Sequence, residues 1–176
     1  GLETGKVGLD PTGLDLTSAD DLTTLRREMK EPSPERLFYV ADAFRAGMSV
    51  EDVHALSFID PWFLDQIEEI VAEEKQLADE GLASLDAARL RKLKRMGFSD
   101  IRLAQLAESD ETAVRNLRNV HKVKPVYKRV DTCAAEFSTS TAYLYSTYED
   151  ECEAEPTGRD KIMILGGGPN RIGQGI

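Results

Sequence analysis

The sequence predicts an all-α fold, a multi-helix domain followed near the C-terminus by one short β-strand and a glycine-rich turn. First, apolar residues recur at helical spacing between residues 18 and 120. Second, Ser or Asp residues able to cap a helix precede these segments, and Pro or Gly follows several of them. Third, an apolar run at residues 162–165 leads into three glycines, as a buried parallel strand leads into a phosphate-type turn.

The composition is that of an ordinary globular protein. The chain has 176 residues, of which 41% are hydrophobic and 31% charged, so it is long enough for one sizeable domain or for one domain and part of another. No apolar run approaches the roughly 18 residues that span a bilayer, and the first residues contain no apolar signal segment. We therefore expect no membrane association and a cytoplasmic location.

The N-terminal third is predicted to contain a linker and two helices. Residues 1–17 form the linker, since four Gly and one Pro occur within the first thirteen residues. A helix follows Thr17 or Ser18 as N-cap and ends before Pro32. Its apolar stripe consists of Leu22, Leu25 and Met29, and that of the second helix, which stops at Gly47, consists of Leu37, Val40, Ala41 and Phe44.

Two further helices begin at clear capping signals. Ser49 and Asp52 have the spacing of a capping box, and Asp60 followed by Pro61 is a strong helix start. The helix from Pro61 is expected to be the longest and to end at Gly81, with Trp62 as a packing anchor. Its inward residues are predicted to be Phe63, Ile67, Ile70, Val71 and Leu77, and its solvent-facing residues Glu68, Glu69, Glu73 and Glu74.

Three short helices are expected next, and after them the helical pattern ends. The helices are expected at residues 86–96, around residues 101–106 and from Asp110, and they complete a helical domain at residues 18–155. Residues 126–137 are irregular, and residues 139–148 favour an extended conformation because they are rich in Tyr, Thr and Ser. An acidic stretch ends in a linker at residues 156–160, and residues 161–176 hold the strand and the glycine-rich turn.

The glycine-rich turn fits neither common phosphate-binding fingerprint. In GGGPNRIGQG at residues 166–175, Arg171 occupies the third glycine position of GxGxxG. For a P-loop, Gly168 and Gly173 have the right spacing, but Gln174 and Gly175 replace the Lys and the Ser or Thr. The turn is therefore either an anion cradle without its own nucleotide site or a purely structural turn.

No group of residues has the pattern of a catalytic or metal site. Two cysteines and two histidines lie far apart, so a zinc or redox motif is unsupported, and paired glutamates on a helix are better explained as a solvated face. The two cysteines are Cys133 and Cys152, and the two histidines are His54 and His121. We predict neither a catalytic residue nor a bound cofactor or metal in this chain.

The charge is unevenly distributed along the chain. The formal net charge is −10, but residues 87–130 contain twelve Lys or Arg and four acidic residues, so this segment carries +8 and the remainder −18. Such a segment can bind nucleic acid, and residues 97–118 also resemble a helix-turn-helix that would present Arg115 and Arg118. The favoured explanation is attraction between the two oppositely charged parts within one fold, with no nucleic acid as partner.

Several long strings resemble the large-subunit family of carbamoyl phosphate synthetases. They are GLETG at the start, VADAFRAG at 40–47, DPWFLDQIEE at 60–69, KPVYKRVDTCAAEF at 124–137, TAYLYSTYE at 141–149 and LGGGPNRIGQGI at 165–176. The strings are unusual, they occur in the family's order, and they extend over essentially the whole chain. The resemblance identifies the sequence as an internal piece of such a subunit.

The resemblance implies a fold and a role. In this family an all-helical connecting, or oligomerisation, domain joins two ATP-grasp halves, so residues 18–155 would be the connector and residues 161–176 the start of the second half. The parent enzyme, a ligase of arginine and pyrimidine biosynthesis, makes carbamoyl phosphate from bicarbonate, glutamine-derived ammonia and two ATP. Its ATP and Mg or Mn sites lie in the ATP-grasp halves, and a glutaminase subunit or domain is its partner.

Two kinds of site residue are expected, and the resemblance implies the first of them. Gly173 and Gly175 would line the family's internal tunnel, where the absence of a side chain leaves space. Leu22 or Leu25, taken as exposed apolar positions on the first helix, would form a self-association face. The competing interpretations are an autonomous DNA-binding helical domain and a complete nucleotide-binding enzyme.

Overall fold

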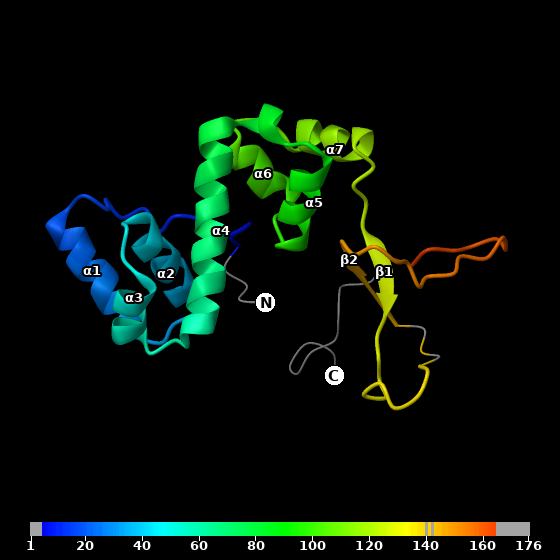
Figure 1. The fold of residues 1–176 in the computed structure, drawn as a ribbon, viewed down its shortest axis with the longest axis horizontal. Helices are drawn as coiled ribbons and strands as arrows, with labels where there is room; N and C mark the ends of the chain where they lie inside the picture. The colour runs from blue at the N-terminus through cyan, green and yellow to red at the C-terminus, as the bar shows by residue number, and fades with distance from the viewer. Residues whose placement is uncertain (1–4, 140, 142, 165–176) are drawn as a thin grey trace.

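The computed structural model describes residues 5–139, 141 and 143–164, and within them the chain is mainly helical, as predicted. Figure 1 shows two groups of helices on either side of one long helix, with a small hairpin beyond them. The helices are α1 (Ala19–Lys30), α2 (Arg36–Arg45), α3 (Val50–Ser57), α4 (Pro61–Glu80), α5 (Ala87–Arg95), α6 (Asp100–Leu106) and α7 (Glu111–Val120). A 3-10 turn, η1 (Leu82–Ser84), joins α4 to α5.

Side-chain caps position most of these helices. In the described residues, every α-helix except α2 has an N-cap side chain that accepts a hydrogen bond from a backbone N–H of the first turn. The caps are Ser18, Ser49, Asp60, Asp86, Ser99 and Asp110. Each satisfies one of the N–H groups that a helix start leaves without a partner. This is why the sequence located the helix starts closely.

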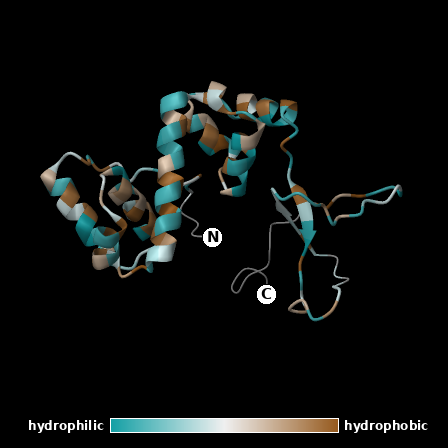
Figure 2. Cartoon of the chain, in the orientation of Figure 1, coloured by the Kyte–Doolittle hydropathy of each residue, from teal (hydrophilic) through white to brown (hydrophobic). Residues whose placement is uncertain are grey.

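Helix α4 belongs to two hydrophobic cores. The first lobe comprises α1, α2, α3 and the first part of α4, and Leu64 and Val71 of α4 join its core. The second lobe comprises the end of α4 with α5, α6 and α7, and Leu77 of α4 joins that core. With 20 residues α4 is about 30 Å long, and Figure 2 shows hydrophobic and hydrophilic residues alternating along it.

The predicted orientation of α4 is partly wrong. Phe63 and Trp62 are 56% and 62% exposed, whereas we expected an inward residue and a packing anchor. Glu74, expected to face water, is only 4% exposed. The buried row of α4 starts at Leu64 and not at Phe63. Positions three, seven and ten residues after Leu64 lie on the same face of the helix, and the last of these positions is Glu74.

The strands form a two-stranded antiparallel sheet. β1 (Val126–Arg129) pairs with β2 (Leu144–Thr147), and Val126 lies opposite Thr147. The extended conformation expected for residues 139–148 is confirmed at β2, whereas β1 is more regular than expected. The hairpin reaches back to the helices, because Arg95 of α5 donates to the Tyr148 carbonyl at 2.8 Å and pairs with Asp150 at 2.9 Å.

The strand expected at residues 162–165 is not observed in residues 162–164, which are the described part of that range. Ile162, Met163 and Ile164 are in no strand and are 84–93% exposed. A strand needs a neighbour for its backbone N–H and C=O groups, and no described segment pairs with these residues. Residue 165 and the glycine-rich turn, with Gly173 and Gly175, lie outside the described residues.

None of the helices in the described part of the chain combines the length and hydropathy needed to cross a membrane.

Candidate functional site

The most unusual feature of the interior is a glutamate shared by two arginines. Glu74 of α4 accepts a hydrogen bond from Arg45 Nη2 at Oε2, at 2.6 Å, and from Arg102 Nε at Oε1, at 2.7 Å. Arg45 ends α2 in the first lobe, and Arg102 lies in α6 of the second lobe. One carboxylate on the shared helix therefore joins the two lobes.

A second layer of polar groups completes this network. Asp42 is 2% exposed, and its carboxylate accepts from Arg45 at 2.7 Å and from the backbone and hydroxyl of Thr12 at 2.9 and 2.6 Å. Asp10 accepts from Arg102 at 3.0 Å. Because each charge has an opposite partner and further hydrogen bonds, the cost of burying it is offset.

The N-terminal segment at residues 5–12, which we call the strap, is part of the same network. The Leu9 carbonyl accepts from Arg102 at 3.3 Å and also from Arg45, and the Val7 carbonyl accepts from the Ser99 hydroxyl at 3.2 Å. At Gly8 a Cβ atom would lie only 3.0 Å from Arg102 Cγ. The strap was predicted to be a linker, but its backbone contacts the arginines of both lobes.

A groove of about 500 Å³ lies beside the strap. Phe38, Ile70 and Phe98 supply apolar walls, and Glu74 and Arg102 lie at its edge. Both of these charged groups already bond to each other and to neighbours. In the described ranges no group of three or more His, Cys, Asp or Glu residues is arranged to hold a metal ion. Lys6 of the strap also lines the groove.

A smaller ionic cluster holds the second lobe together. Asp100 at the start of α6 accepts from Arg118 of α7 at 2.7–2.9 Å and from Lys94 of α5 at 2.9 Å. Burial raises the pKa of the Asp100 carboxyl, but the hydrogen bonds and charges of Arg118 and Lys94 outweigh this effect and leave the pKa below its usual value. Lys94 also lies 5.2 Å from the centre of the Tyr148 ring, next to the hairpin.

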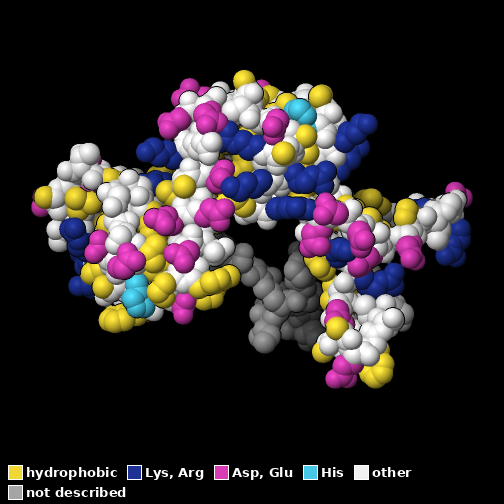
Figure 3. Space-filling view, viewed as in Figure 1, with side chains coloured by type: hydrophobic (Ala, Val, Ile, Leu, Met, Phe, Trp, Pro, Cys, Tyr) yellow, Lys and Arg dark blue, Asp and Glu magenta, His cyan; other side chains and the backbone are white. Residues whose placement is uncertain are grey.

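The basic segment is largely neutralised within the fold, as the favoured interpretation expected. Lys92 pairs with Glu73 at 2.5 Å, and Figure 3 shows Lys and Arg side chains interspersed with acidic ones. Arg118, expected on a DNA-reading face, is only 14% exposed at its side chain and bonds to Asp100, while Arg115 pairs with Glu111. The two arginines that a helix-turn-helix would present to DNA are therefore both paired with carboxylates of the chain itself.

The predicted self-association residues are less accessible than expected. Leu25 is 0% exposed and lies in the core of the first lobe, so the expectation that it is exposed is wrong. Leu22 is partly buried against the same core. The reason is that α1 packs on α2 and α3 with its apolar stripe, which leaves its polar face outward. A self-association role of Leu22 stays a prediction.

Sequence reasoning missed the Glu74 network, although one signal pointed to it. Glu74 lies three residues after Val71 and three before Leu77, both of which are buried. A carboxylate in the middle of an apolar helical row needs a buried cation, and the sequence offers Arg45 at the end of an apolar helix. Which arginines meet it depends on how the lobes pack, so the sequence alone does not specify them.

The described residues thus define a class: a helical structural module with two lobes held together by buried ion pairs. Residues 1–122 match the family described as carbamoyl-phosphate synthetase large chain, oligomerisation domain. The chain belongs to this family.

Relatives resemble the chain from end to end. It is 79% identical to the carbamoyl phosphate synthase large chain of Xanthomonas axonopodis pv. citri, 74% identical to that of Xylella fastidiosa strain Temecula1 and 60% identical to that of Pseudomonas aeruginosa. In each comparison all 176 residues are aligned, and they span 16% of the relative's length.

Replacing Glu74 by Ala is predicted to destabilise the chain by about 3–5 kcal/mol, because Arg45 and Arg102 would remain partly buried without their carboxylate. Glu68→Ala, at an exposed position of the same helix, should change stability by less than about 0.5 kcal/mol. Urea unfolding followed by circular dichroism measures both. Equal effects of the two substitutions would contradict the structural role of Glu74.

Asp100 should make the stability of the second lobe pH-dependent. Its pKa is lowered by folding, so its contribution is present above the unfolded value of about 4 and is lost as the pH falls through the folded value. Asp100→Asn should therefore destabilise the chain at pH 7, by about 1–3 kcal/mol, and the difference from wild type should shrink below about pH 4. Unfolding midpoints across pH 3–7, with the exposed Asp79→Asn as control, test this. A difference that is constant with pH would contradict it.

Proposed function

We propose that this chain is a region of the large chain of a glutamine-dependent carbamoyl phosphate synthetase, and that it serves there as the structural connector between two synthetase halves. The observation that carries the proposal is the end-to-end similarity to large chains at 79% identity, with the chain covering 16% of their length. The match to an oligomerisation-domain family over residues 1–122 supports a structural and self-associating role.

In this proposal the chemistry belongs to the whole large chain. That chain would act as an ATP-dependent carbon–nitrogen ligase, making carbamoyl phosphate from bicarbonate, ammonia released from glutamine and two ATP, for arginine and pyrimidine biosynthesis in the cytoplasm. ATP with Mg or Mn would bind in its ATP-grasp halves, and a glutaminase subunit or domain would supply ammonia. No residue of this chain is assigned a catalytic role, and the isolated chain is expected to be inactive.

Three structural features suit a connector. Helix α4 is a single rod about 30 Å long that runs through both lobes. The strap, near the N-terminal end, bonds to residues of both lobes. The hairpin, near the other end, is anchored on α5 through Arg95. A displacement of the strap or of the hairpin would therefore be transmitted to packed helices rather than absorbed by a flexible linker. Gly173 and Gly175 remain candidates for a tunnel wall within this proposal.

A chimera tests the proposed function. The corresponding segment of the Xanthomonas axonopodis pv. citri large chain is replaced by this chain, and glutamine-dependent carbamoyl phosphate formation is measured with the glutaminase present. We expect activity close to that of the unmodified enzyme. The isolated 176-residue chain should hydrolyse no ATP, and light scattering after size exclusion should show self-association.

Two results would contradict this function. One is a chimera that is soluble and monodisperse but makes no carbamoyl phosphate. The other is ATP hydrolysis by the isolated chain, which would favour the competing interpretation of a complete nucleotide-binding enzyme. A shortened chain ending at Glu155 serves as the matched control, because it lacks the glycine-rich segment but keeps each helix found in the described residues.

A further inference from the structure

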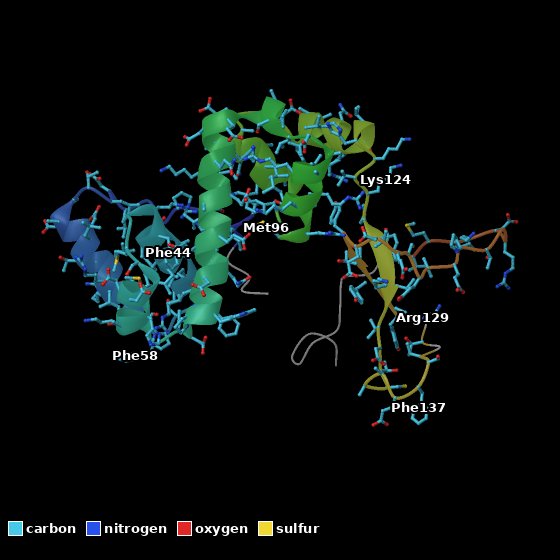
Figure 4. The ribbon with its side chains drawn as sticks, in the orientation of Figure 1. Phe44, Phe58, Met96, Lys124, Arg129 and Phe137 are labelled. Carbon is cyan, nitrogen blue, oxygen red and sulfur yellow. The ribbon has the colours of Figure 1, made fainter. Side chains whose placement is uncertain are left out.

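Three aromatic side chains are exposed near the junction of α3 and α4 in the first lobe. Phe58, Trp62 and Phe63 are 84%, 62% and 56% exposed, and we call them the aromatic corner. Phe58 is the C-cap of α3, and the other two lie in the first turn of α4, where their rings meet edge to face at a centroid distance of 4.9 Å. Figure 4 shows Phe58 at the lower end of this lobe, and Figure 3 shows hydrophobic side chains there.

The residue at position 58 is unfavourable for the isolated chain. Phe58 has φ 56°, in the left-handed region that costs an L-residue free energy and usually holds Gly or Asn at a helix end. Its ring is also almost fully exposed, so contacts within the described chain return little of this cost. A bulky aromatic residue in a strained, solvent-facing position is better explained by a contact with another protein surface.

The surroundings of the corner indicate the charge of that surface. Residues 46–72 contain six acidic residues and no Lys or Arg, and a basic side chain from outside this stretch, Arg36 of α2, donates to the Ser57 carbonyl. Asp60, Asp65 and Glu68, which are close to the three aromatic residues in the sequence, are exposed. A partner that covers the corner would therefore present an apolar pocket with Lys or Arg at its rim, since opposite charges align two surfaces and like charges repel them.

The size of the corner favours a tethered partner over a second copy of the chain. Fully buried aromatic side chains contribute about 150–250 Å² each, so three partly exposed ones supply less than the roughly 800 Å² that each partner contributes to a stable interface between free proteins. A partner within the same polypeptide needs less, because tethering provides an effective concentration on the order of millimolar. The relatives are large enough for this, since the chain spans 16% of their length.

We propose that the aromatic corner is the docking surface for another part of the same large chain, one that offers an apolar pocket rimmed by basic side chains. The inference rests on the proposed function, which supplies the longer chain. The corner then fixes the first lobe to a neighbouring domain, while the strap and the hairpin connect the module at its other sides.

Hydroxyl-radical footprinting of Trp62, read by mass spectrometry of its peptide, tests the docking. It compares the isolated chain with the active full-length chimera at several dilutions. We expect oxidation of Trp62 to be several-fold slower in the full-length chain at every concentration. Equal oxidation in the two proteins would overturn the proposal. If Trp62 is protected from oxidation in both proteins and the protection disappears on dilution, the proposal is overturned, because a second copy of the chain then covers the corner.

A substitution separates docking from folding. Phe58→Gly should raise the urea midpoint of the isolated chain, because the left-handed strain is removed, and should increase the oxidation of Trp62 in the full-length chain. Ile101→Ala, at an apolar position of the second lobe that is 41% exposed, should leave Trp62 oxidation unchanged. Unchanged protection in the Phe58 variant would contradict the proposal. An active chimera with unprotected Trp62 defeats the docking inference alone, whereas an inactive soluble chimera defeats the proposed function.

Discussion

The structure depends most on the burial of one carboxylate, that of Glu74, between two arginines. A buried carboxylate without partners would be far more costly than any single apolar contact could offset. Arg45 and Arg102 must therefore both reach α4, and each belongs to a different lobe. This requirement specifies how α2 and α6 lie against the long helix. Apolar packing alone tolerates more than one arrangement, because it is not directional.

The other features of the module follow from this requirement. Arg45 and Arg102 can donate more hydrogen bonds than Glu74 can accept. Asp42, Asp10 and the Leu9 carbonyl therefore accept further hydrogen bonds from them. The strap is ordered for that reason, and glycine at position 8 lets its backbone approach Arg102. A segment that looks like a linker in composition thus lies against the helices and bonds to residues of both lobes.

The sequence predicts the elements of this fold better than their relations. Capping signals at Ser18, Ser49 and Asp60 locate helices because they act within one turn. The sequence pattern predicts the wrong face for Glu74, since the choice between two overlapping apolar rows depends on neighbours distant in sequence. Residues 162–164 have strand propensity, but propensity cannot supply the second strand. The family, by contrast, is evident from long strings of residues in the sequence.

Because of the shared helix and the Glu74 network, we expect the two lobes to unfold as one cooperative unit. Native-state hydrogen exchange tests it most directly, by comparing slow amides of the two cores, such as those of Val40 and Leu93. We predict that amides of both cores open with the same free energy and the same dependence on denaturant. A second lobe that opens at clearly lower free energy while the first stays protected would contradict it.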